Sequence, residues 1–276
     1  MRLDRFYRFS RFALVLGLAS CVSLPGTNRK GLILVSRDYE ISLGDEAYRE
    51  VLAQNAGGNG KASKLITSGP RYEMLQRVGK RIAAVSDVKD FDWKFSLVDD
   101  PTMNAFCLPG GKVVFYTGIL PILKNEASMA IVMGHEVAHA VARHGAERMS
   151  RTMLVQAGVV AVSAGAFHKD PQKFGASMAL LGAGATVGLI LPFSRSNETE
   201  ADTIGLRYAA RAGYDPSEGP KFWSRFSAAV GGGKPPQWLS THPADESRIK
   251  NLNHLQQEVW ADYEKSPKYG LGETIK

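Results

Sequence analysis

One apolar segment, residues 129–142, constrains the fold of this chain more than any other part of its sequence. Apart from a His-Glu-x-x-His motif at 135–139, it holds apolar or small residues on every side of a helix. Asn125 is a type of residue that caps helices, and Glu126 would follow in the first turn, where the helix dipole favours a carboxylate. Because a helix that is apolar all round is buried, the sequence predicts a central helix with two histidines and a glutamate in the core.

The spacing of this motif predicts a metal site with one zinc ion (Zn2+) per chain. Residues four apart on a helix point the same way, so the imidazoles of His135 and His139 can reach one ion at the ~2.0–2.1 Å that zinc prefers. Glu136 lies about a quarter-turn round the helix, where it can take a proton from water at the metal. The alternative is chance placement on an amphipathic helix. The opposite face is apolar too, however, and buried polar groups are costly unless a metal compensates them.

A third protein ligand is usual in a catalytic zinc site, and two later carboxylates are its best source. Glu198 and Asp202 are four apart in a segment of helical pattern, so they share one face. We expect Glu198 to bind the metal and Asp202 to accept a hydrogen bond from a ligand imidazole, whereas Glu200 would point away. The alternative for these carboxylates is a solvated helix face. His144 lies about 140° round the helix from His139 and cannot share the ligand face, so we expect it to be structural or at the end of the helix.

Four blocks of sequence carry a resemblance to a known family. They lie at residues 104–111, 134–144, 194–202 and 239–243. Together they resemble the gluzincin zinc metallopeptidases that include the CAAX prenyl protease, the heat-shock protease HtpX and the periplasmic proteases BepA and LoiP. The resemblance covers roughly residues 65–255 and keeps the family order of the blocks. The chain lacks the long helical-repeat region of BepA and the clear transmembrane hairpins of HtpX, and it looks most similar to short lipoprotein members such as LoiP.

The resemblance implies a set of site residues and a fold. The family's Glu-x-x-x-Asp maps onto Glu198 and Asp202, as metal ligand and as the residue that orients a ligand imidazole. His242, in the family's Thr-His-Pro block, would lie at the metal, either as an oxyanion donor or as an inhibitory fourth ligand. The implied fold is α+β and mainly helical, a zincin-type metallopeptidase domain with a small sheet beside the active-site helix. The residues we expect to bind substrate are Asn104, Lys112, Val113, Val114 and Arg195.

Local patterns add elements to this mixed fold. Pro70 begins a helical pattern that continues to about residue 85, and residues 91–98 alternate as a strand does. Residues 112–116 predict another strand. If this strand lies at the edge of the sheet, substrate could add to it as an extended strand; the alternative is an internal strand of the core. Cys107 is most simply a small buried hydrophobe.

The first twenty residues have the pattern of a bacterial lipoprotein signal peptide. An Arg-rich start and a short apolar run, 12–19, lead to Leu-Ala-Ser before Cys21, which resembles a lipobox, the site where a lipid is attached to cysteine. The run is too short to span a bilayer. The alternative is an ordinary signal peptide or an uncleaved anchor, with Cys21 incidental. Lipid on Cys21 would leave Cys107 alone, so no intrachain disulfide would stabilise the fold.

We divide the chain into a signal peptide (1–20), an N-terminal anchor segment (21–64), a zinc metallopeptidase domain (65–255) and a C-terminal tail (256–276). The signal holds four Arg and one Asp, so its removal reduces the net charge from +7 to +4. Because this charge is mild and no basic cluster is interleaved with aromatic residues, nucleic acid is not an expected partner.

The predicted function is that of a zinc-dependent endopeptidase of the periplasm, attached to the outer membrane through lipid on Cys21. The resemblance implies that its substrates are misfolded or misassembled envelope proteins. One alternative is an integral membrane metalloprotease, with residues 174–193 as a spanning helix. Four glycines in that segment, and Glu198 five residues later, favour buried or lid-like helices over the active site instead. The other alternative is a non-catalytic, chaperone-like zinc lipoprotein, against which the intact Glu136 argues.

Overall fold

The computed structural model describes residues 21–58, 60, 62–167, 170–185, 191–229, 238, 242 and 246–275. The predicted signal peptide, residues 1–20, lies outside this part of the chain. The helices are α2 (Arg37–Asn55), α3 (Pro70–Val85), α4 (Leu120–Leu123), α5 (Glu126–Val141), α6 (His144–Phe167), α7 (Pro171–Ala185), α8 (Leu191–Arg211), α9 (Glu218–Ala229), α11 (Glu246–Glu258) and α12 (Trp260–Lys265), with a short 3-10 turn η1 (Thr117–Ile119). The strands are β1 (Cys21–Ser23), β2 (Lys30–Leu32), β3 (Leu65–Ile66), β4 (Lys94–Val98), β5 (Ala105–Leu108) and β6 (Lys112–Tyr116). The predicted fold class, mainly helical with a small sheet, is confirmed.

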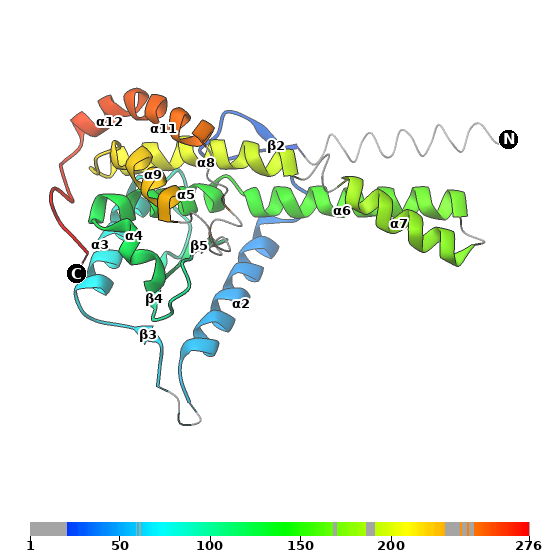
Figure 1. Ribbon diagram of the computed structural model, residues 1–276, viewed down its shortest axis with the longest axis horizontal. Coiled ribbons are helices and arrows are strands. Elements are labelled where there is room, and N and C mark those ends of the chain that lie inside the picture. The colour runs from blue at the N-terminus through cyan, green and yellow to red at the C-terminus, as the bar shows by residue number, and fades with distance from the viewer. Residues whose placement is uncertain are drawn as a thin grey trace.

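Helix α5 is the central helix of the core, as its sequence predicts. Every residue of it is buried except His139, and the side chain of Asn125 caps it by accepting a hydrogen bond from the amide of Ser128. Helix α8 packs closely along α5, and α3 and β5 also lie against it (Figure 1). The two helices approach so closely at Gly134 that a Cβ there would lie 2.5 Å from the carbonyl oxygen of Gly205. This contact fixes the spacing between the two predicted ligand-bearing helices.

The four-stranded sheet has the order β3-β4-β6-β5. Strand β6 is parallel to β4 and antiparallel to β5, so it is bonded on both sides. Of the two alternatives for residues 112–116, the internal strand is the one observed, and the edge beside α5 is β5 (Ala105–Leu108). Strand order depends on pairing between distant segments, which the alternation of one strand does not encode.

Helices α6 and α7 pair with each other and extend together away from the rest of the molecule (Figure 1). The large apolar side chains that they expose are Met153, Leu154, Val160, Val162, Leu180 and Leu181. The expectation that the apolar segment starting at residue 174 lies buried or lid-like over the active site is wrong for 174–185, since most of its described side chains are exposed. Residues 186–190 lie outside the described chain. Among the described helices, none combines the length and the hydropathy needed to cross a membrane.

The N-terminal segment packs against the beginning of α6. Strands β1 and β2 form an antiparallel pair, and Leu24 and Ile33 are buried against Ala146. The amide of Leu34 donates a hydrogen bond to the hydroxyl of Ser150 at 2.8 Å. The segment that follows Cys21 is therefore anchored on the same helix that begins the projecting pair.

Candidate metal centre and active site

Two helices bring three potential ligands to one point. His135 and His139 lie one turn apart on α5, and their Nε2 atoms are 3.1 Å apart. Glu198 on α8 lies opposite, with its carboxylate oxygens 3.3 Å from the Nε2 atom of each histidine. The close packing of α5 on α8 produces this convergence of groups that lie some sixty residues apart in the sequence.

His242 adds a fourth nitrogen to this cluster. Its Nδ1 atom lies 3.2 Å from His135 Nε2 and 2.9 Å from a Glu198 oxygen. One ligand atom from each of the four residues lies within 4.8 Å of the others. Three imidazole nitrogens and a carboxylate are donors that zinc accepts, so the donor set fits a zinc site.

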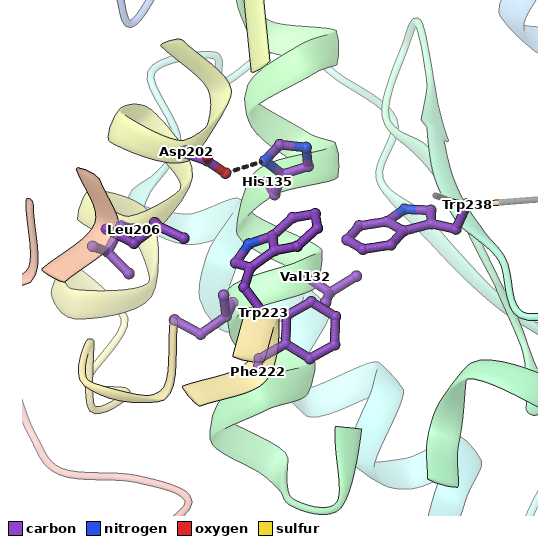
Figure 2. A pocket seen from close by; sticks show the side chains of 9 residues that line it. Val132, His135, Asp202, Leu206, Phe222, Trp223 and Trp238 are labelled. Carbon is purple, nitrogen blue, oxygen red and sulfur yellow. Dashed lines mark ion pairs between the residues drawn. The ribbon is translucent and has the colours of Figure 1, made fainter. Parts of the chain in front are cut away.

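Asp202 lies directly behind His135, as its spacing from Glu198 predicts. Its carboxylate is 3.0 Å from His135 Nδ1, the ring nitrogen that faces away from the ligand cluster (Figure 2). Arg248 of α11 donates two hydrogen bonds to this carboxylate, both at 2.7 Å, and also reaches Glu198 at 3.1 Å. The Arg248 guanidinium lies over the ring of Trp223, 3.6 Å from its centroid. The orientation of His135 is thus fixed by a carboxylate that is itself held on both oxygens.

Glu136 is buried, and the position of its carboxylate is fixed by an aromatic residue. The indole nitrogen of Trp238 donates a hydrogen bond to Glu136 Oε1 at 2.8 Å. The same oxygen lies 3.5 Å from His242 Nε2. The carboxylate therefore lies beside the ligand cluster without belonging to it, which is the position expected of a proton acceptor.

Behind His139 the helix ends, and His144 lies just beyond that end, which is one of the two positions expected for it. The helical path breaks at Arg143, whose φ is 56°, and His144 begins α6. This break returns the His144 ring to the back of His139, with the two Nδ1 atoms 2.9 Å apart. The other nitrogen of His144 lies 2.9 Å from Glu200. Glu200 points away from the ligand cluster, as expected, but its carboxylate contacts His144, which in turn contacts the ligand residue His139.

Burial and the charges of the cluster shift the pKa values of its members in opposite directions. Burial raises the pKa of Glu198, but hydrogen bonds from His135 outweigh it and hold that pKa below its ordinary range. Burial also raises the pKa of Asp202, but the charge of Arg248 outweighs it and holds that pKa below its ordinary range as well. Burial also opposes protonation of His135, yet Asp202 and Glu198 raise its pKa to about 9. In His139 burial prevails and lowers the pKa well below 6.5. The two carboxylates are therefore ionised at neutral pH and favour a cation.

A cleft with a volume of about 340 Å³ opens beside the cluster. Edge strand β5 lines one side of it, and Glu136, His139 and Glu198 line another. Among the residues expected to bind substrate, Asn104 lines this cleft. Arg195 is exposed on α8 and lines a neighbouring pocket with Ser247 and Asn251.

The three expected substrate residues of β6 lie away from the cleft. Val113 and Val114 have no exposed surface, and the ammonium of Lys112 is buried, where it donates hydrogen bonds to Asp92 and the carbonyl of Gly110. The backbone of β6 is fully paired in the sheet. Neither the side chains nor the backbone of Lys112, Val113 and Val114 face the cleft, so the structure does not bring these three residues to the site.

Sequence reasoning missed Trp238 and Arg248. Trp238 lies in a Gly- and Pro-rich stretch and Arg248 in a polar C-terminal helix, and neither has a local spacing that relates it to the zinc motif. Their roles depend on tertiary contacts alone. For His144 a signal was present in its distance of five from His139, but the change of direction at Arg143 was not visible in the residue types.

A model of Peptidase family M48 matches residues 71–256. The chain belongs to peptidase family M48. This M48 chain is a zinc metalloendopeptidase, as its sequence predicts, and the His/Glu cluster fits the zinc that the family uses. The likeness to LoiP in particular stays a prediction.

Curated relatives lie in both mitochondria and bacteria. Mitochondrial metalloendopeptidase OMA1 of Schizosaccharomyces pombe is 39% identical over 247 residues, which cover 89% of this M48 chain and 69% of the relative. The OMA1 of Saccharomyces cerevisiae is 33% identical over 269 residues, 91% of this chain and 74% of the relative. The beta-barrel assembly-enhancing protease of Yersinia pestis is 30% identical over 238 residues, 84% of this chain and 46% of the relative. The chain thus spans just under half of the bacterial relative.

Proposed function

We propose that this metalloendopeptidase is lipid-anchored in the bacterial periplasm, on the outer membrane, and degrades misfolded or misassembled envelope proteins. The name of the Yersinia pestis relative, which refers to β-barrel assembly, supports envelope proteins as the substrate class. The lipobox-like sequence before Cys21 supports the anchor. Cys21 is exposed at the start of β1, where a lipid could extend from the protein without disturbing the core.

In this proposal His135, His139 and Glu198 hold the zinc ion, and Asp202 orients His135. The metal would supply a Lewis acid for the scissile carbonyl and lower the pKa of the attacking water. Glu136 accepts the proton of that water and then donates it to the leaving amine. The hydrogen bond from Trp238 keeps one Glu136 oxygen in place and leaves the other for the proton. The observation that carries the assignment is the convergence of four ligand atoms within 4.8 Å beside this carboxylate.

His242 is proposed as an inhibitory fourth ligand in the conformation described. Its Nδ1 atom faces the other ligand atoms, 3.2 Å from His135 Nε2 and 2.9 Å from Glu198, which supports a ligand role over that of an oxyanion donor. Fourfold coordination by protein closes a zinc site to water, so His242 must move away before a substrate is cleaved. His242→Ala should then open the site.

Substrate is proposed to bind in an extended conformation along β5. An edge strand offers unpaired backbone groups to which a peptide can add, and β5 lines the cleft beside Glu136. Asn104 directly precedes this strand, lines the cleft and is proposed to contact the peptide. Contact of Arg195 with substrate remains a prediction.

The peptidase assignment is tested by Glu136→Gln in the purified protein. Casein cleavage should fall on the order of 10²–10⁴-fold, because a general base is lost, while the zinc content stays unchanged. Glu46→Gln, an exposed position on α2, is the matched control and should cleave as the wild type does. If neither the wild type nor His242→Ala, in which the proposed fourth ligand is absent, cleaves any substrate although both bind zinc, the assignment fails and a chaperone-like role is favoured.

The substrate class and the anchor need separate measurements. Proteomics of cells that carry Glu136→Gln should reveal accumulated outer-membrane proteins. Mass spectrometry of the N-terminal peptide should find an acyl-modified Cys21, and Cys21→Ala should release the protein from membranes washed with carbonate. An unmodified Cys21 would contradict the anchor without affecting the peptidase assignment.

A further inference from the structure

We propose that Arg29, Glu200 and His144 form a hydrogen-bonded chain that holds His139 in its metal-binding orientation. The N-terminal segment, which contains Arg29, would then help to position a metal ligand. The inference rests on the proposed role of His139 as a zinc ligand. It concerns positioning, since none of the three residues belongs to the ligand cluster itself.

The hydrogen bonds of this chain are consistent with one set of tautomers. His139 Nε2 faces the other ligand atoms, so its proton must lie on Nδ1 when a metal is bound. That Nδ1–H can donate to the Nδ1 of His144, 2.9 Å away. The proton of His144 is then on Nε2, which donates to Glu200 Oε2 at 2.9 Å. Each donor therefore meets an acceptor from His139 outward to a carboxylate.

The break between α5 and α6 makes this arrangement possible. Arg143 adopts a φ of 56°, a conformation that non-glycine residues seldom take. It is buried, and its guanidinium donates to Glu40 of α2 at 2.7 Å, a contact that stabilises the turn. The chain direction changes within one residue, and His144, only 4% exposed, lies against the back of His139.

Arg29 holds the outer end of the chain. Its Nε and Nη2 atoms donate to the Glu200 carboxylate at 2.7–3.1 Å. Its Nη1 and Nη2 atoms also donate to the two oxygens of Glu147, each at 2.9 Å, and Glu147 is fully buried. A guanidinium with a forked contact to each of two carboxylates has a fixed position. Arg29 thus connects the N-terminal segment with α6 and α8 at once.

The two histidines on α5 differ in how they are held. His135 contacts the carboxylate of Asp202 directly, whereas His139 reaches the carboxylate of Glu200 through the ring of His144. Partners of ligand histidines affect metal affinity by about 10–100-fold when they are lost. We therefore expect the effect on zinc affinity to decrease along the chain, from His144 to Glu200 to Arg29.

The test uses the purified full chain and three measurements: zinc affinity by competition with a chromophoric chelator, the visible absorption of the cobalt-substituted protein, and the melting temperature of the zinc-free protein. His144→Phe should weaken zinc binding about 10–100-fold and alter the cobalt spectrum. His144→Gln, which keeps an acceptor and a donor, should recover part of the affinity. Arg29→Gln should weaken binding less. Arg37→Gln, which removes an exposed ion pair with Asp90, is the matched control and should change neither metal measurement.

A double-mutant cycle tests whether the residues act in series. In the His144→Phe background, Arg29→Gln should have no further effect on zinc affinity, because the connection to His139 is already lost. Unchanged affinity and an unchanged cobalt spectrum in His144→Phe, with only a lower melting temperature, would overturn the proposal in favour of a structural role. If His144→Phe does not fold, Glu200→Gln and Arg29→Gln decide by the same measurements. A wild type that binds no zinc would instead contradict the proposed function.

Discussion

Two pairs of helices in this protein contain glycines, yet α5 with α8 lies in the core and α6 with α7 projects from it (Figure 1). In the core pair, small residues allow contact between backbones: a Cβ at Gly134 would lie 2.5 Å from Gly205. In the projecting pair, Gly158, Gly165, Gly175 and Gly182 have no neighbour within 4 Å of a Cβ. The same residue type therefore serves close packing in one region and lies at open surface in the other. The presence of glycine alone does not separate the two cases.

The largest difference in stability is expected between a leucine of the core pair and a leucine of the projecting pair, each replaced by alanine. Leu206 on α8 is 2% exposed and packs beside Phe222 and Trp223, whereas Leu180 on α7 is 76% exposed. Leu206→Ala should lower the free energy of unfolding by about 2–5 kcal/mol because it leaves a cavity. Leu180→Ala should change it by less than about 0.5 kcal/mol. Urea denaturation of the zinc-free proteins measures both, and similar losses would contradict the difference in packing.

The sequence predicts the core pair better than the projecting pair, for physical reasons. Helix α5, its Asn125 cap and the helix that begins at Pro70 follow from local periodicity and capping. The Glu198 and Asp202 pair follows from helical spacing. Strand order does not, because it depends on pairing between distant segments, and so the sequence left open whether residues 112–116 form an edge strand or an internal strand. The exposure of α7 was missed because an uncharged segment normally lies in a core or in a membrane.

The surroundings of the site show the same division. Residues that are related to the motif by spacing were found, and those related to it only by tertiary contact, Trp238 and Arg248, were not. The role of His144 was obscured by an assumption that one helix continues through Arg143, whose positive φ ends it. Helical spacing predicts the relative direction of two side chains only when both lie in the same continuous helix.

Glycine substitutions should have opposite signs in the two regions. Gly134→Ala places a methyl group against the Gly205 carbonyl, so it should lower the free energy of unfolding by about 1–3 kcal/mol and weaken zinc binding as α5 and α8 separate. Gly158→Ala meets open space on α6 and should raise it by about 0.5–1 kcal/mol, since alanine has the higher helix propensity. Melting temperatures with and without zinc would reveal these signs. Destabilisation by both substitutions would mean that the projecting pair is packed against something.

Acid should weaken the contact between α9 and the core helix α5. Glu218 of α9 accepts a hydrogen bond from Ser128 at 2.8 Å, and although burial raises its pKa, this bond and others hold the pKa below its ordinary value of 4.5. A lowered folded-state pKa means stability that is present above pH 4.5 and is lost as the pH falls through the folded-state value. Glu218→Gln should therefore be about 1–2 kcal/mol less stable than wild type at pH 7, and the difference should shrink in acid.

The matched carboxylate in the projecting pair is Asp170. It is partly exposed, pairs with Lys173 and accepts a hydrogen bond from the Lys173 amide at the beginning of α7. Asp170→Asn keeps a side chain that caps helices equally well, so unfolding at pH 7 and in acid should not change measurably. A pH-dependent loss in this variant would indicate that α7 contributes more to global stability than its exposure suggests.

The smallest effect concerns the contact between α6 and α7 themselves. The hydroxyls of Ser163 and Ser177 are 2.8 Å apart, and Ser163 is buried between the helices. Ser163→Ala removes one hydrogen bond, worth about 0.5–1 kcal/mol, from a region that can open without the core. Amide hydrogen exchange in α7 should then accelerate about 2–5-fold, while exchange in α5 stays the same. Acceleration in both helices would mean that the core pair and the projecting pair unfold as one unit. The two pairs would then differ in solvent exposure but not in local stability.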